Sequence, residues 1–180
     1  MGEPKQLLPW EGATLIEHCV KQATSVCAEA FVVLGAAFDL ISERLANYSI
    51  NILNNTHWQA GQGSSISFGM KEILKRNSFD GVLIMLADQP QVDSNYLSEL
   101  VKKFSKYPNK IIATSYVQSI GVPAIFAEQH FDSLLSLSGD RGAKRIIMEN
   151  VSSMISIKPE VPISDIDSIE DYLKLYKEFH

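Results

Sequence analysis

The sequence is poor in the residues that mark secreted or membrane proteins. Its only two cysteines, Cys19 and Cys27, are too few for a disulfide framework and are typical of reduced thiols. It has no apolar run of about 18 residues, the length that a membrane-spanning helix needs. It also has no charged and then apolar leader with a cleavage site. These absences predict a cytoplasmic protein with no membrane partner.

Positive charge and metal-binding patterns are also scarce. The sequence has 16 Lys and Arg residues and 21 Asp and Glu residues, so its formal net charge is -5. A negative chain repels nucleic acid at long range, and we expect no nucleic-acid partner. The 4 histidines show no metal-ligand spacing, and no Ser, His and Asp order is evident. A zinc site and a triad hydrolase are therefore not supported.

The length and composition are those of one domain. The chain has 180 residues, of which 46% are hydrophobic, which is enough for one compact core and too little for two large ones. We find no internal repeats, linkers or low-complexity tracts. The sequence therefore predicts a single domain over residues 1–180.

Hydrophobic periodicity predicts an alternation of helices and strands. Apolar residues at helical spacing follow Thr14, a candidate cap, and predict a helix over 14–24. The segment 30–35 is short, β-branched and continuously apolar, which favours a strand buried on both faces. The other predicted helices cover 39–47, 67–75, 94–106, 129–137, 141–149 and 168–179, and the other strands cover 49–53, 81–86, 110–114, 122–126 and 154–157. This rhythm is typical of an α/β fold with a parallel sheet.

An acidic residue follows one of these strands. Asp88 comes after the apolar strand at 81–86, and Pro90 ends the ladder because it lacks an N–H. Ligands of open parallel sheets bind beyond the carboxyl ends of the strands. A carboxylate there could hold Mg²⁺. A simple turn-capping role for Asp88 is the equally supported alternative.

Two further segments could contact phosphate or a base. Lys5 lies in a Gly-Glu-Pro-Lys turn that would fix its ammonium group for a phosphate, although a solvated surface lysine is the simpler interpretation. The loop at 54–65 contains Gly61 and Gly63, which permit close backbone approach, before a predicted helix. Amide groups at a helix start can bind an anion, but such loops are also ordinary connectors.

Two further charged segments could bind an anion or a metal ion. Asp140 and Arg141 lie in a basic stretch at the start of a predicted helix, where cations oppose the helix dipole unless an anion is bound. A solvated basic helix face is the alternative. Asp167 and Glu170 have the spacing of a capping box. Asp167 could equally supply a second carboxylate to a metal.

Six segments occur in an order that resembles the MobA-like NTP transferases, and among them the molybdenum cofactor cytidylyltransferase branch. They are MGEPKQLLPW, NTHWQAGQGSSISFG, LIMLADQPQVD, GVPAIF, LSGDRGAKRII and DIDSIEDY, and together they span essentially the whole chain. The resemblance implies a nucleotide-diphospho-sugar transferase fold of Rossmann-like type. In that fold helices cover both faces of a mixed, mainly parallel twisted sheet, in three layers (αβα). Residues 1–180 would form one NTP-transferase-like domain.

The resemblance also implies an activity and its site. The chain would transfer CMP from CTP to a molybdopterin-type cofactor and release pyrophosphate. Mg²⁺ would be held by Asp88 and Asp167, and Lys5 would neutralise charge on the triphosphate. Asn55, Gly63, Ser64 and Ser65 would frame cytosine and ribose, while Asp140 and Arg141 would lie toward the pterin-bearing substrate.

Several alternatives and partners stay open under this resemblance. The enzyme could instead use GTP or a sugar phosphate, or the chain could be a non-catalytic binding protein on the same fold. A molybdoenzyme or a chaperone could be a partner, and so could a second copy of the chain.

One family segment has no counterpart in the sequence. The family carries a hydrophobic strand and a Gly-rich loop, of the kind Leu-Ala-Ala-Gly-x-Ser-x-Arg, ahead of the Met-Gly with which this sequence starts. We expect the native reading frame to continue upstream through them, the alternative being a naturally shortened and inactive protein. A missing central strand leaves two rows of unpaired backbone groups. We therefore expect a marginal domain, or one that recruits a neighbouring chain or a rearranged segment.

Overall fold

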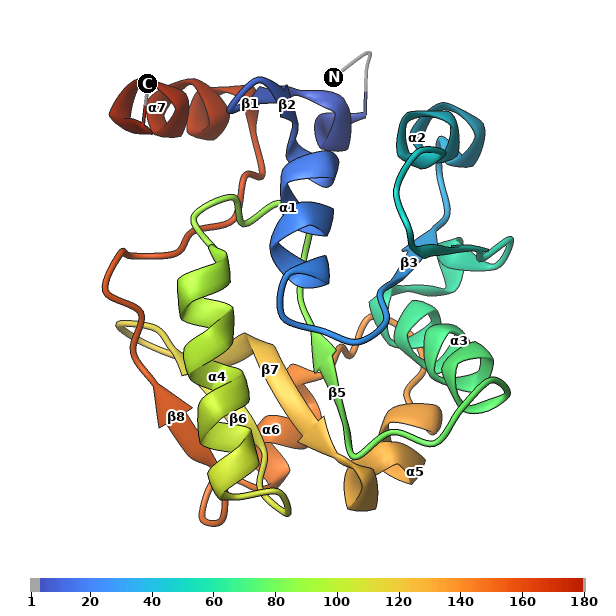
Figure 1. Ribbon diagram of the computed structural model, residues 1–180, viewed down its shortest axis with the longest axis vertical. Helices are drawn as coiled ribbons and strands as arrows, with labels where there is room; N and C mark the ends of the chain where they lie inside the picture. The colour runs from blue at the N-terminus through green and yellow to red at the C-terminus, as the bar shows by residue number, and fades with distance from the viewer. Residues whose placement is uncertain (1–3, 180) are drawn as a thin grey trace.

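A mixed sheet layer, interrupted once, forms the middle of the protein, whose computed structural model describes residues 4–179 (Figure 1). Residues 1–3 and 180 of the predicted domain lie outside the described residues. Two parallel strands, β3 (Phe31–Leu34) and β4 (Asn51–Asn54), form one sheet. The second sheet has the order β5-β7-β6-β8, with β5 (Gly81–Ile84), β6 (Ile112–Ser115), β7 (Ile120–Ala127) and β8 (Ile155–Ile157).

The directions of the strands confirm a mixed, mainly parallel arrangement. In the second sheet β7 is antiparallel to both β5 and β6, whereas β6 and β8 are parallel. β3 and β5 run the same way in Figure 1. Within the described residues no hydrogen bond joins β3 to β5, so the sheet that we expected to be continuous is divided there.

Helices cover both faces of this layer, which confirms the three-layer prediction. They are α1 (Leu15–Thr24), α2 (Phe38–Leu45), α3 (Gln62–Leu74), α4 (Ser94–Lys106), α5 (Phe131–Leu135), α6 (Lys144–Glu149) and α7 (Ile169–Phe179). Side chains alternate between the two faces of a strand. On β6, Ile112 packs with α4, while Ala113 packs with α3, α5 and α6 on the other face.

Two helices begin at residues whose side chains cap them, Thr14 as the sequence predicts and Asp93, which was not predicted as a cap. Thr14 and Glu17 form a complete capping box at α1, in which each side chain bonds the other residue's backbone N–H. At α4 the Asp93 side chain accepts a hydrogen bond from the Tyr96 N–H. The bounds of α4 are those that the sequence predicts, and α1 differs only in that Thr14 is its cap.

Two predicted helix starts and one candidate capping pair are wrong. α3 begins at Gln62 rather than at 67, because its glycines pack against a neighbouring loop instead of interrupting the helix. α6 begins at Lys144 rather than at 141, so Asp140 and Arg141 lie in the preceding loop. Before α7, Ser168 and Asp171 form the reciprocal cap, and not Asp167 and Glu170. Asp167 is therefore free of a capping role.

Other predicted bounds shift by shorter lengths. The predicted helix at 129–137 is a 3₁₀ turn, η3 (Glu128–His130), followed by α5. Two more 3₁₀ turns, η1 (Lys5–Leu7) and η2 (Trp58–Ala60), lie in segments that the sequence predicts as loops. Turns of this kind are too short to produce a recognisable hydrophobic period in the sequence.

A small hairpin ahead of α1 was not predicted from the sequence. It consists of β1 (Pro9–Trp10) and β2 (Ala13–Thr14), which pair in antiparallel register. Glu11 and Gly12 between them have φ angles of 47° and 74°, as a two-residue hairpin turn with left-handed residues requires. The fully buried Trp10 packs against α7 and the start of α1, which ties the two ends of the chain together.

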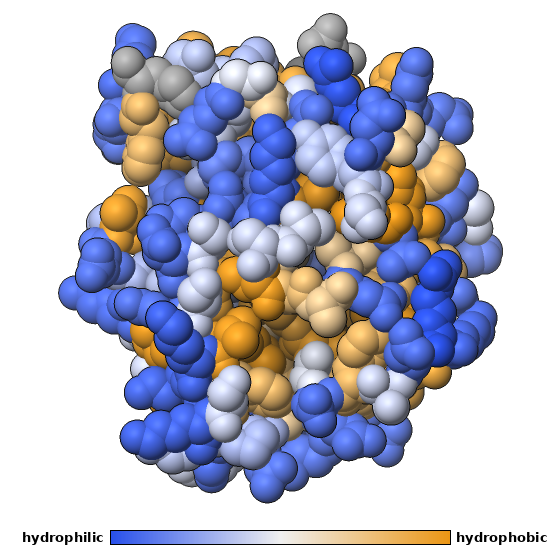
Figure 2. Space-filling model, viewed as in Figure 1, coloured by the Kyte–Doolittle hydropathy of each residue, from blue (hydrophilic) through white to orange (hydrophobic). Residues whose placement is uncertain are grey.

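The cysteines and the lengths of the helices agree with the sequence analysis. Cys19 and Cys27 are both free thiols. Among residues 4–179, no helix has the length and apolar character needed to cross a bilayer. Figure 2 shows a hollow with apolar side chains on the face where β3 and β5 part.

Candidate functional site

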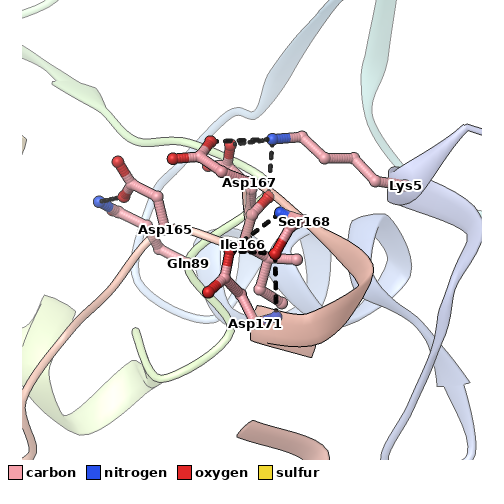
Figure 3. Close-up of polar contacts among 8 residues, drawn as sticks. Lys5, Gln89, Asp165, Ile166, Asp167, Ser168 and Asp171 are labelled. Carbon is pink, nitrogen blue, oxygen red and sulfur yellow. Dashed lines mark hydrogen bonds and ion pairs between the residues drawn. The ribbon is translucent and has the colours of Figure 1, made fainter. Parts of the chain in front are cut away.

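Lys5 lies at the centre of the first group of predicted site residues (Figure 3). Its Nζ donates hydrogen bonds to Asp88 Oδ2 and to the Ile166 carbonyl oxygen, both at 2.8 Å. The same nitrogen lies 3.8 Å from Asp167 Oδ1. The Lys5 and Asp88 side chains are only 25% and 21% exposed, whereas Asp167 is 82% exposed. One ammonium group therefore draws together two carboxylates that are distant in sequence.

The end of β5 and the segment before α7 hold these groups in place. The Ile166 N–H donates to the Asp88 carbonyl oxygen at 2.9 Å. The Gln89 Nε2 donates to Asp165 Oδ1 at 2.7 Å and to the Tyr116 hydroxyl at 3.0 Å. The backbone around Asp88 is thus fixed to the backbone around Asp167.

The carboxylate pair fits a divalent cation that takes other ligands from its substrate. Asp88 Oδ1 is buried and has no hydrogen-bond partner among the described residues. A buried acceptor without a partner is costly unless something binds it. No group of three or more His, Cys, Asp or Glu residues converges within residues 4–179. Mg²⁺ is commonly bound by one or two carboxylates with substrate phosphates, and Asp88, Asp167 and the Ile166 carbonyl could supply such a set.

Two titratable groups near Asp88, the Cys19 thiol and the Tyr116 hydroxyl, are kept protonated at neutral pH. Burial raises the pKa of the Cys19 thiol to about 12, and the negative charge of Asp88 adds to this effect. The Cys19 Sγ lies 3.5 Å from the Leu86 carbonyl oxygen, to which it donates. Burial also raises the pKa of Tyr116 to about 12, against the hydrogen bond from Gln89. Neither group can act as a nucleophile at neutral pH.

The second group of predicted site residues lies around the start of α3, and the side chain of Asn55 is hydrogen-bonded within it. The group consists of Asn55, Gly63, Ser64, Ser65, Asp140 and Arg141. The Asn55 side chain is only 3% exposed. The Asn55 Nδ2 donates to Ser65 Oγ at 3.0 Å, and its Oδ1 accepts from the His57 N–H at 3.0 Å. The amide of Asn55 therefore braces the loop ahead of α3, and a direct contact of Asn55 with a base stays a prediction.

Glycines bring the start of α3 onto the loop that carries Asp140 and Arg141. The Gly63 N–H donates to the Gly139 carbonyl oxygen at 2.8 Å. A Cβ atom on Gly61, where φ is 98°, would lie 2.4 Å from the Gly139 carbonyl carbon. A Cβ atom on Gly63 would lie 2.5 Å from the Arg141 carbonyl oxygen. Only glycine fits at these two positions, and the contact places the exposed Asp140 and Arg141 beside the α3 start.

The two groups border one cavity of about 1330 Å³. Its lining includes Gly61 and Ser65 from the α3 start, and Leu86, Gln89 and Asp165 from the side of the carboxylates. The Ser64 Oγ bonds the Ala60 carbonyl oxygen within the first turn of α3. Among the predicted site residues Ser65 lines this cavity, and Asp88 lies in sequence between the lining residues Ala87 and Gln89.

Three polar residues of the site were missed by the sequence analysis. Gln89 directly follows Asp88, and Asp165 lies two residues before Asp167, but neither was predicted to belong to the site. Tyr116 follows β6 and its hydroxyl bonds the Val122 carbonyl oxygen as well as Gln89. A polar residue at the end of a second parallel strand was the signal that could have identified Tyr116.

Comparison with known proteins identifies the class of fold and domain. A family model described as "MobA-like NTP transferase domain" matches residues 1–154. The chain is 25% identical to the purine catabolism protein PucB of Bacillus subtilis and 28% identical to nicotine blue oxidoreductase of Paenarthrobacter nicotinovorans, in both cases over 96% of this chain and 87% of the relative.

Shorter matches and solved structures agree with this result. The chain is 30% identical to the molybdenum cofactor cytidylyltransferase of Escherichia coli, over 44% of this chain and 42% of that protein. Rv0371c of Mycobacterium tuberculosis has the same fold, with a TM-score of 0.81, 22% identity and coverage of 98% of this chain and 91% of that chain. Its structure has also been solved in complex with manganese, and there the TM-score is 0.78 at 22% identity, with 98% and 93% coverage.

Proposed function

Because the chain belongs to the MobA-like NTP transferase family and is a nucleotidyltransferase of that family, we propose that it transfers CMP from CTP to a molybdopterin-type cofactor. A phosphate oxygen of the acceptor forms a bond to the α-phosphorus of CTP as the bond from that phosphorus to pyrophosphate breaks. Pyrophosphate leaves with the displaced electron pair. A molybdoenzyme, or a chaperone of one, would receive the product.

The observation that carries the proposal is the convergence of Asp88 and Asp167 on Lys5. Phosphoryl transfer needs positioning and neutralisation of charge more than a protein nucleophile. The ammonium group of Lys5 can bind a phosphate oxygen of CTP, and Cys19 and Tyr116 stay protonated beside it. In the described part of the site these residues supply binding groups, and neither Cys19 nor Tyr116 acts as a nucleophile.

Mg²⁺ is the proposed cofactor. Asp88 and Asp167 would hold it with the Ile166 carbonyl oxygen, and the buried, unpartnered Asp88 Oδ1 supports this assignment. When bound, the ion would neutralise charge on the phosphates. The likeness in fold to Rv0371c, which has been crystallised with manganese, motivates the choice of a divalent cation.

Binding of the nucleotide is assigned to the second group. Asn55 fixes the shape of the loop from which Gly63, Ser64 and Ser65 lead into α3, and these residues would frame cytosine and ribose. Asp140 and Arg141 are exposed beside the start of α3 and would face the pterin-bearing substrate. Their positive and negative charges lie outside the buried part of the site, where a large acceptor can reach them.

GTP is the second candidate for the nucleotide. A probable molybdenum cofactor guanylyltransferase of Bacillus cereus is 30% identical to this chain over 62% of its length, a longer match than that of the cytidylyltransferase. The experiment measures pyrophosphate release from CTP and GTP separately, with Mg²⁺ and molybdopterin. Faster release from CTP supports the proposal, and faster release from GTP assigns the chain to guanylyl transfer.

The matched variants are Asp88→Asn and Asp39→Asn. Asp39 is an exposed carboxylate in the first turn of α2, and its replacement should leave turnover unchanged. Asp88→Asn keeps the shape of the side chain but removes its charge, and turnover should fall by roughly 100-fold or more. Equal turnover in the two variants would remove Asp88 from the mechanism.

A further inference from the structure

Trp58 is a large aromatic residue that the protein leaves open to solvent. Its exposed fraction is 42%, whereas Trp10, the other tryptophan of the sequence, is only 1% exposed. Trp58 is also one of the residues that line the cavity of about 1330 Å³. A ligand in this cavity can therefore cover the exposed ring and remove a large apolar area from water.

A hydrogen-bonded turn holds Trp58 in place. Trp58 begins η2, and its N–H donates to the Asn55 carbonyl oxygen at 3.2 Å. The Gly61 N–H donates to the Trp58 carbonyl oxygen at 3.0 Å, just ahead of α3. The Asn55 N–H donates in turn to the Leu34 carbonyl oxygen at 2.8 Å, at the end of β3. The turn is thus anchored to the sheet, and a ligand that covers the ring has little backbone to order.

The side chain of Trp58 packs on Gly35, the residue that follows β3. A Cβ atom on Gly35 would lie 2.3 Å from the Trp58 Cβ and 2.4 Å from its Cγ. Any side chain at position 35 would therefore displace the indole. Glycine at this position lets the indole lie against the carboxyl end of β3, which is where ligands of parallel sheets bind.

The group around Lys5 lies at the same edge of the sheet layer. Because β3 and β5 run in the same direction in Figure 1, Gly35 and Asp88 both follow strands that end at this edge. The lining of the cavity extends from Trp58 to Gln89, which directly follows Asp88. A ligand that reaches from Trp58 to Lys5 would have an aromatic ring at one end and negative charge at the other. A nucleoside triphosphate has this form.

We propose that the indole of Trp58 is the surface on which the base of the nucleotide stacks. The inference rests on the proposed function, to which it adds the residue that binds the base and the type of contact. The base is favoured over the pterin ring of the acceptor, because Trp58 is bonded directly to Asn55, a residue assigned to cytosine and ribose. Stacking suits every base, since each has a π-face. The choice between CTP and GTP would then depend on hydrogen-bonding groups around the ring.

Nucleotide binding by the 180-residue chain and its variants tests the proposal. Trp58→Ala should raise the dissociation constant of CTP, measured with Mg²⁺ by calorimetry, by roughly tenfold or more. Trp58→Phe keeps an aromatic face and should lose much less. Inorganic tripolyphosphate, which has no base, should bind equally to all three proteins. Tyr107→Ala is the matched control, because Tyr107 is an exposed aromatic residue that follows α4 and lies outside the lining of the cavity.

Tryptophan fluorescence provides a second readout that does not depend on affinity. CTP should quench the emission of the unchanged chain, because a base stacked on an indole quenches it. In Trp58→Phe only the buried Trp10 emits, and CTP should leave that emission unchanged. Quenching of equal size in the two proteins would place the base away from Trp58.

Other results would also overturn the proposal. Equal dissociation constants of CTP for the unchanged chain and Trp58→Ala would exclude stacking, and so would failure of the unchanged chain to bind either nucleotide. An equal loss of tripolyphosphate binding would show that the substitution disturbs the phosphate groups instead. Quenching by 6-hydroxymethylpterin but not by CTP would assign the ring to the acceptor.

The stacking contact and the proposed reaction can fail separately. Quenching and base-dependent binding without any release of pyrophosphate would refute the transfer reaction and leave the contact at Trp58 standing. Pyrophosphate release with the same KM for CTP in the unchanged chain and in Trp58→Ala would support the reaction and refute the contact.

Discussion

The side chain of Gln89 is hydrogen-bonded to the carboxylate of Asp165, with 2.7 Å between Nε2 and Oδ1. Because Gln89 directly follows Asp88 and Asp165 precedes Ile166, this bond sets how far apart the two halves of the candidate metal site stand. The Ile166 N–H, bonded to the Asp88 carbonyl oxygen, provides the second connection. The site therefore depends on two segments that share no secondary structure.

Replacing Gln89 with Leu should loosen the segment that carries Asp167 without unfolding the protein. The variant loses the bonds to Asp165 and Tyr116 but also removes the buried Gln89 Oε1, which has no partner among the described residues. The free energy of unfolding should therefore change by less than about 1.5 kcal/mol. Hydrogen exchange of the Ile166 amide should become faster. The exposed Gln129→Leu serves as control, and unchanged exchange at Ile166 in the Gln89 variant would contradict the positioning role.

Replacing Lys5 with Met should strengthen the binding of a divalent cation. The ammonium group now occupies the space between Asp88 and Asp167, and its removal leaves two carboxylates without their counter-ion. Titration with Mn²⁺ should show a dissociation constant several-fold lower than in the unchanged chain, while CTP binds more weakly. Lys102→Met, on the exposed side of α4, should leave both constants unchanged. Weaker Mn²⁺ binding by the Lys5 variant would argue against a metal at these carboxylates.

The stability of the fold should decrease as the pH falls through the ordinary range of histidine. Burial lowers the pKa of His18, although Glu11 and Asp93 favour its charged form and Lys21 opposes it. The unfolded chain therefore binds a proton at a higher pH than the folded chain does, and protonation favours unfolding. Urea unfolding measured between about pH 5 and pH 8 should show this loss. His18→Gln should have a flatter profile, and an unchanged profile would place the effect elsewhere.

The turn of the β1–β2 hairpin should not tolerate a side chain at Gly12. Its φ of 74° is left-handed, and an added Cβ would meet no atom within 4 Å, so only the backbone conformation opposes substitution. Gly12→Ala should reduce the free energy of unfolding by about 1 to 2 kcal/mol in urea titrations. Gly12→Asn should lose less, because Asn adopts this conformation more readily. Equal losses would show that conformation does not limit the position.

Local signals in the sequence determined much of the fold. Thr14 with Glu17 and Asp93 with Tyr96 satisfy backbone groups at the helix ends, and such contacts lie within a few residues of one another. The start of α3 was misplaced because Gly61 and Gly63 argue locally against a helix. These glycines are needed because the start of α3 packs closely against residues 139–141. This contact is distant in sequence, so no local pattern predicts it.

The candidate site was predictable in its acidic residues but not in its geometry. Asp88 could be found because it follows an apolar strand, and Asp167 because it lies in an acidic segment. That Lys5 would bridge them depends on three segments meeting in space. The assignment of Asp167 as a cap failed for a related reason, since Ser168 with Asp171 has the same spacing and forms the actual cap.

Within residues 4–179, β3 pairs with β4 and β5 pairs with β7, and the other edge of each strand has no strand partner. These open edges also affect how concentrated solutions of this chain behave. An unpaired strand edge with apolar side chains is a template on which another molecule can add a strand, and repeated addition leads toward fibrils. The net charge of -5 keeps molecules apart at low ionic strength, but salt screens this repulsion. Storage in dilute, low-salt buffer therefore favours the monomer, whereas concentration and added salt favour turbidity.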